Sequence, residues 1–120
     1  MDESDIINQI EDRLKAATKE LHQLAPQVGQ AEQVIEFASD QRKNALAAEA
    51  KRYIERGEGA AMSDSLARTS PLYIEKMKQL ETDFANAQVT KYKWKATMCS
   101  FEAARSLLAR QRETIHTFKE

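Results

Sequence analysis

After Pro71 the chain contains no glycine or proline, and this absence constrains its fold more than any other feature. Both residues are the usual signals of turns, so a long segment without them is unsuited to a sheet of short strands. Apolar residues recur there at seven-residue intervals, at Tyr73, Leu80, Ala87, Trp94, Phe101, Leu108 and Ile115, with Met77, Phe84 and Met98 between them. The pattern predicts a helix over 71–118, about 48 residues and roughly 70 Å long. A stripe of that length must be covered by a partner.

The first half of the chain carries a similar pattern. Apolar residues alternate by three and four steps, at Ile7, Ile10, Leu14, Ala17, Leu21, Leu24, Val28, Ala31, Ile35 and Ala38. This spacing is typical of a coiled-coil seam and predicts a helical arm over 5–56, capped by Ser4 or Asp5. Pro26 removes a backbone hydrogen bond, but the phase continues past it, which favours a kinked or briefly interrupted helix over a loop. Gly57 is a natural residue to end this arm.

Residues 57–70 form the connector between the two arms. They include two of the three glycines and three serines, and we expect a short helical turn around 63–68. The serines Ser63, Ser65 and Ser70 are interpreted as helix caps, and Ser70 before Pro71 is a specific helix start. We therefore predict one all-α domain over 1–120, a long antiparallel, coiled-coil-like helical hairpin that assembles into a helical bundle.

The charge distribution supports the antiparallel arrangement. The 120 residues have a formal net charge of -1, but residues 1–40 carry nine acidic and three basic residues, and residues 88–120 carry seven basic and three acidic ones. An antiparallel hairpin places the acidic start beside the basic end, with Glu11 and Asp12 near the level of Arg112 to His116. Surface ion pairs add little stability, but an imbalance of this kind specifies orientation.

Two helices cannot surround all the large rings of these stripes, and each large apolar side chain that is fully buried contributes roughly 1.5–3 kcal/mol. We therefore expect self-association, with a dimer favoured, or docking of the hairpin on a protein partner. The predicted self-association seam contains Ile7, Leu14, Leu21, Tyr73, Leu80, Trp94, Phe101 and Leu108. Lys91, Arg105 and Arg112 occupy seam-like positions on the alternate track, which argues against a dry core along the last third.

Residues that could carry catalysis or hold a metal are few. Glu113 and His116 form an E-x-x-H pair, but a di-iron bundle needs a second such pair and two more glutamates, so a solvated helix end is the favoured interpretation. Cys99 has no histidine nearby in sequence and is interpreted as a partly buried small side chain. We predict no catalytic residue, no metal, no cofactor and no enzymatic activity. The lone cysteine and the absence of a long apolar run indicate a cytoplasmic protein without a membrane partner.

The segment Lys91-Tyr92-Lys93-Trp94-Lys95 interleaves basic and aromatic residues, a composition that can bind phosphates and stack on bases. On a helix, however, Trp94 belongs to the seven-residue track, so a core tryptophan among solvated lysines is the favoured interpretation. A basic face could still bind nucleic acid or an acidic protein surface. Its candidate residues are Lys91, Lys93, Lys95, Arg105, Arg110 and Arg112.

The stretch from Tyr92 to Glu113, with its step Arg105-Ser106-Leu107-Leu108, resembles the ends of small helical proteins that bacteriophages encode in their replication and recombination gene blocks. The resemblance covers about a fifth of the chain and implies an accessory protein that acts through partners. The leading hypothesis is a non-enzymatic helical interaction protein that binds a host or phage protein in the host cytoplasm. The alternative is a nucleic-acid-binding accessory protein that uses the basic C-terminal face.

Overall fold

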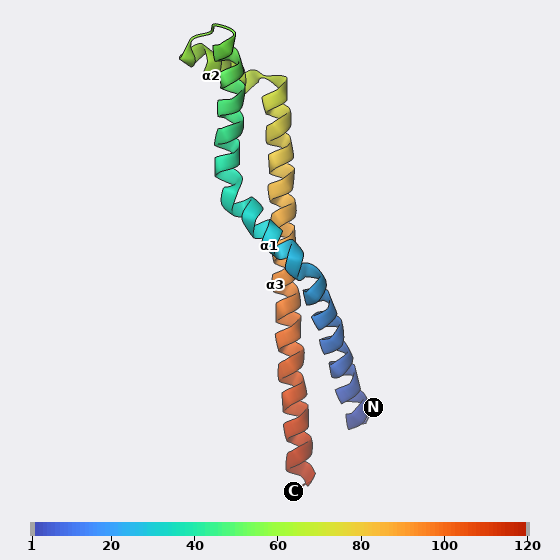
Figure 1. Cartoon of the computed structure of the whole chain (residues 1–120). Coiled ribbons are helices and arrows are strands. Elements are labelled where there is room, and N and C mark those ends of the chain that lie inside the picture. Colours follow the sequence, from blue (N-terminus) through green and yellow to red (C-terminus); the bar gives the residue numbers. More distant parts are fainter. Residues whose placement is uncertain (1, 120) are drawn as a thin grey trace. The chain divides into compact units, whose positions relative to one another are not determined.

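The computed structural model describes residues 2–119, and its side chains are described for residues 2–115. Over this part of the chain the fold is all-α, with no strand (Figure 1). Helix α1 spans Glu3–Glu55, α2 spans Ala60–Thr69 and α3 spans Pro71–Lys119. The two long helices are the predicted arms of a helical hairpin, which confirms the fold class.

The chain divides into two compact units, and each unit contains parts of both long helices. Unit 1 joins the segment of α1 up to Gly29 to the segment of α3 from Thr90, and unit 2 spans Gln30–Val89. Within each unit the two segments run antiparallel. In unit 1, Arg112 contacts Glu11, and in unit 2, Ser70 contacts Glu49. The single domain over 1–120 stays a prediction.

Helix α1 continues through Pro26 without interruption. The missing N–H removes one hydrogen bond from the helix, but the apolar phase is the same on both sides, with Leu24 and Ala31 both buried. Proline is tolerated here because the packed face continues past it. The cap differs from the expected one: the carboxylate of Asp2, rather than Ser4 or Asp5, accepts a hydrogen bond from the Asp5 backbone N–H at 2.9 Å.

The end of α1 is a Schellman turn. Gly57 has a φ of 100°, a left-handed conformation that favours glycine. The Glu58 N–H donates to the Tyr53 carbonyl and the Gly57 N–H to that of Ile54, which is the bond pattern of this motif. The predicted stop at Gly57 is therefore confirmed. The connector holds a full helix, α2, in place of a single turn, and Ser63 lies fully buried inside it. The interpretation of Ser63 and Ser65 as caps is wrong, because both lie inside α2.

One of the two predicted apolar tracks of α3 shifts by one residue along the helix. The seven-residue track stays packed from Tyr73 to Ile115, but beyond Ala87 the alternate track moves, so Thr97 and Ala104 are buried where the repeat predicts Met98 and Arg105. The seam-like positions assigned to Lys91, Arg105 and Arg112 are wrong, because all three are exposed. The burial pattern steps by three twice in succession, through Phe84, Ala87 and Thr90. Such an extra three-residue step moves the face of a coiled coil.

Candidate binding surface

The packing of unit 1 is thin and rich in alanine. Its core cluster consists of Ile10 from α1 and Ala104 and Leu108 from α3, with Ile6, Ile7 and Leu14 packed against it. Ala104 is only 1% exposed. Small side chains such as that of Ala104 let two helices approach closely. Short side chains then line the edges of the contact.

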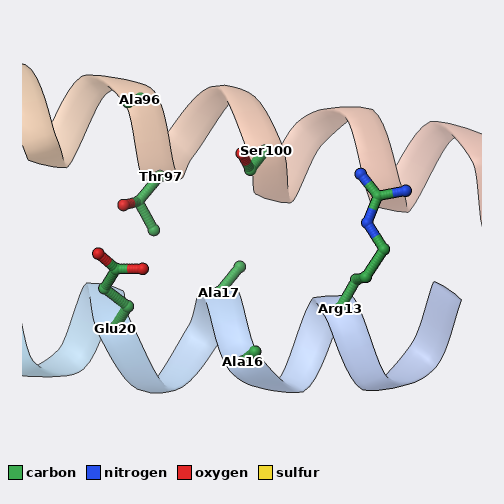
Figure 2. A pocket seen from close by; sticks show the side chains of 7 residues that line it. All are labelled: Arg13, Ala16, Ala17, Glu20, Ala96, Thr97 and Ser100. Carbon is green, nitrogen blue, oxygen red and sulfur yellow. The ribbon is translucent and has the colours of Figure 1, made fainter. Parts of the chain in front are cut away.

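One edge of this contact is a shallow groove between α1 and α3, about 300 Å³ in volume. Figure 2 shows the side chains that line it. They come from two turns of α1 and little more than one turn of α3 and are Arg13, Ala16, Ala17, Glu20, Ala96, Thr97 and Ser100. The floor is made of small residues, while Arg13 and Glu20 stand at opposite ends (Figure 2).

The charged and polar groups of the groove have no partner in the described part of the chain. Arg13 and Glu20 are seven residues apart, roughly 10 Å along the helix, and take part in no ion pair with described residues. Thr97 is 7% exposed and projects from α3 towards α1 (Figure 2). No described residue hydrogen-bonds its hydroxyl. Among the described side chains the one buried polar atom without a partner is Ser63 Oγ, so the Thr97 hydroxyl at this end of the groove reaches solvent.

The predicted basic residues Lys91, Lys93, Lys95, Arg105, Arg110 and Arg112 are all exposed. They do not share one face: at 3.6 residues per turn, Lys91, Lys95 and Arg105 lie on one flank of α3, whereas Lys93 lies on the opposite flank. Arg112 contributes Nη2 to an ion pair with Glu11 Oε1 at 3.4 Å. This contact confirms the expected level of Glu11 beside Arg112. The His116 side chain lies outside the described residues.

Unit 2 contains a buried polar cluster. The Ser70 hydroxyl donates to Glu49 Oε1 at 2.8 Å, and Arg52 contacts the same carboxylate at 3.0 Å. The hydrogen bond from Ser70, with help from Arg52, lowers the pKa of Glu49 although burial opposes it. Ser70 precedes α3 as predicted, but its hydroxyl binds a side chain of α1. This bond ties the start of α3 to the last turns of α1.

Unit 2 also exposes large apolar side chains. They are Phe37, Ile54, Met62, Leu72, Ile74 and Val89, each between 43% and 61% exposed. Ile54, Met62, Leu72 and Ile74 belong to the end of α1, to α2 and to the start of α3, which lie together in Figure 1. Sequence reasoning missed this group because it follows no single helical repeat.

The predicted seam residues pack inside the chain. Leu80 and Leu108 are buried, while Ile7, Leu14, Leu21, Tyr73, Trp94 and Phe101 are half-buried. Their role in self-association stays a prediction. Cys99 is exposed, so its interpretation as a partly buried side chain is wrong. Among the described side chains, no three His, Cys, Asp or Glu residues gather closely enough to hold a metal ion.

Comparison with known proteins adds no identity: no family model, curated protein or solved structure matches the chain. In the described residues, no helix combines the length and the apolar character that crossing a membrane requires.

Proposed function

We propose that this chain is a non-enzymatic helical interaction protein, encoded by a bacteriophage, that acts by binding a host or phage protein. The observation that carries the proposal is the exposure of four large apolar side chains of unit 2, those of Ile54, Met62, Leu72 and Ile74. Large apolar side chains left in contact with water on a small helical protein are favourable places for a protein partner to dock. Occupation of a functional surface on the partner, and hence inhibition, is the mode of action that fits this size.

The incomplete burial of the rings supports the same proposal. Tyr73, Phe84, Trp94 and Phe101 are all half-buried, and the largest side chain that is fully buried among the described residues is that of Ser63. The chain by itself therefore leaves large apolar surfaces in contact with water. Burial of these apolar surfaces against a partner would be favourable, because it removes them from water.

Affinity capture from the native host, with and without nuclease, tests the proposal. We expect the wild-type protein to retain a specific host or phage protein after nuclease treatment. The double variant Met62→Asp/Leu72→Asp should lose it, because two carboxylates would be desolvated at the contact. The matched control Ser65→Asp/Thr82→Asp adds the same charge at exposed polar positions and should retain it. Equal retention by both variants would contradict the proposed surface.

The alternative function is nucleic-acid binding by the basic residues of α3. It is favoured by the exposure of Lys91, Lys95, Arg105 and Arg110, none of which is paired with a described residue. This function predicts affinity for DNA or RNA that falls steeply with salt. Joint neutralisation of these four residues should abolish that affinity and flatten the salt slope. Unchanged DNA retention by the quadruple variant would refute it.

A further inference from the structure

The face of α3 beside the groove is exposed and contains no charged residue over four turns. Its members are separated by three or four residues, except for the adjacent central pair, and are Tyr92, Ala96, Cys99, Ser100, Ala103 and Leu107. Residues at this spacing lie on one side of a helix. Tyr92 is 70% exposed and Leu107 is 38% exposed. We refer to this row as the outer stripe.

The outer stripe reads nearly the same in both directions. Its midpoint falls between Cys99 and Ser100, with Ala96 and Ala103 at equal distances from it, and Tyr92 and Leu107 at equal distances further out. An antiparallel copy of the same helix, centred on this point, would therefore place alanine against alanine and tyrosine against leucine. Large side chains then meet at the ends while small ones permit close approach at the centre.

The groove side of α1 has a matching symmetry of charge. Arg13 and Glu20 lie at equal distances from the midpoint between Ala16 and Ala17. In an antiparallel copy, Arg13 of each chain faces Glu20 of the other, so the interface gains two ion pairs related by a two-fold axis. A self-complementary surface of this kind is what a two-fold symmetric dimer requires.

The two midpoints lie at the same level of unit 1. Ser100 and Ala17 line the same stretch of the groove, and Figure 2 shows Ser100 across from Ala17 and Thr97 across from Glu20. One two-fold axis can therefore pass both midpoints at once. The symmetry of the outer stripe on α3 does not require the charge symmetry on α1. Their coincidence at the groove therefore favours a second copy of this chain as the partner that binds there.

The Thr97 hydroxyl at the edge of the groove fits the same arrangement. It lies at the Glu20 end of the groove, where the antiparallel copy brings its Arg13. A guanidinium carries five N–H donors in a planar fork and can donate to the Glu20 carboxylate and to the Thr97 oxygen together. The second copy thus gives the Thr97 hydroxyl, which reaches solvent in one chain, a partner in the protein.

We propose that two copies of this chain associate antiparallel through the groove and the outer stripe of unit 1, around a two-fold axis near Ser100. This dimer uses residues of unit 1 only, whereas the proposed protein-binding surface belongs to unit 2. The two proposals can therefore fail separately.

Sedimentation equilibrium over micromolar concentrations, with four variants, tests the dimer. The wild-type mass should approach twice the 13.7 kDa of one chain. Arg13→Glu and Glu20→Arg each place like charges together twice and should weaken dimerisation by roughly 10- to 100-fold. The double variant Arg13→Glu/Glu20→Arg restores both pairs in reversed order and should recover most of the affinity. Lys15→Glu, with the same change in charge on the same helix, should leave it unchanged.

Circular dichroism of each variant should show the wild-type helix content, because all the altered side chains are exposed. A wild-type monomer throughout the concentration range would overturn the proposal. So would dimerisation that is insensitive to Arg13→Glu, or a double swap that remains as weak as the single variants. A higher oligomer that persists in Arg13→Glu would also overturn it, because another surface would then hold the copies together.

Discussion

Two adjacent leucines of α3 allow a sharp test of packing in unit 1. Leu108 is 9% exposed and belongs to the cluster of Ile10 and Ala104, whereas Leu107 is 38% exposed on the outer stripe. Substitution of a buried leucine by alanine costs about 2–5 kcal/mol. Because this cluster is small and open at its edges, we expect Leu108→Ala to lower the free energy of unfolding by about 2–3 kcal/mol. Leu107→Ala should lower it by about 1 kcal/mol or less.

Urea unfolding followed by Trp94 fluorescence measures this difference, since Trp94 is the one tryptophan and lies in unit 1. Each variant should be measured at two protein concentrations. The loss caused by Leu108→Ala should be the same at both, while that caused by Leu107→Ala should grow with concentration, because that residue also lies in the proposed dimer contact. Equal losses for the two variants at low concentration would refute the register of α3 in unit 1.

Three further predictions concern unit 2 and use thermal or urea unfolding followed by circular dichroism. Ser70→Ala should lower the free energy of unfolding by about 1–3 kcal/mol and raise the pKa of Glu49 towards its ordinary value of about 4.5. Because the pKa of Glu49 is lowered in the folded state, its carboxylate stabilises the fold above pH 4.5, and this contribution is lost as the pH falls through the folded pKa. A wild-type stability that is the same at pH 5 and pH 3 would contradict this. Ser63→Ala removes a buried hydroxyl that has no partner among the described residues and should be neutral or stabilising, and a loss above about 1 kcal/mol would show that the hydroxyl is bonded. Gly57→Ala should cost about 1 kcal/mol through its positive φ, whereas Gly59→Ala, at a φ of -69° in open space, should cost less, and the reverse order would contradict the Schellman turn.

The helical hairpin could be predicted from the sequence because several signals agree along it. The heptad spacing, the stop at Gly57 and the start at Pro71 each indicate a boundary or a face, and the charge imbalance indicates the direction of the arms. A fold can be predicted from its sequence when the local signals, such as helix stops and starts, agree with the overall arrangement of the helices. The structure confirms the hairpin and the contact of Glu11 with Arg112.

The register of the second half could not be predicted from the repeat alone. Met98 continues the seven-residue spacing and is the more apolar residue, yet Thr97 is the buried one. Whether residue 97 or residue 98 is buried depends on how closely α1 and α3 approach each other. Ala104 is only 1% exposed, which shows that only short side chains fit at this contact. Burial in a thin hairpin thus follows size as much as hydrophobicity.

The groove was not predicted because its signal is a symmetry across two helices rather than a motif within one. The only trace in the sequence is the spacing of Arg13 and Glu20 around Ala16 and Ala17. Opposite charges seven residues apart are common on helix surfaces, so this spacing gains meaning only when the level of Ser100 is known. The polar cluster of Glu49 and Ser70 is likewise invisible, since 21 residues separate its two members.

Cysteine cross-linking at the proposed two-fold axis is the most direct test of the central claim, that two chains associate antiparallel through unit 1. Ser100→Cys and Ser106→Cys are each made in a Cys99→Ser background and oxidised. In an antiparallel dimer the two copies of residue 100 meet at the axis, within the Cα distance that a disulfide spans, whereas the two copies of residue 106 lie roughly 20 Å apart. We predict a covalent dimer for Ser100→Cys alone. Equal cross-linking at both positions would indicate parallel chains, and none at residue 100 would contradict the interface.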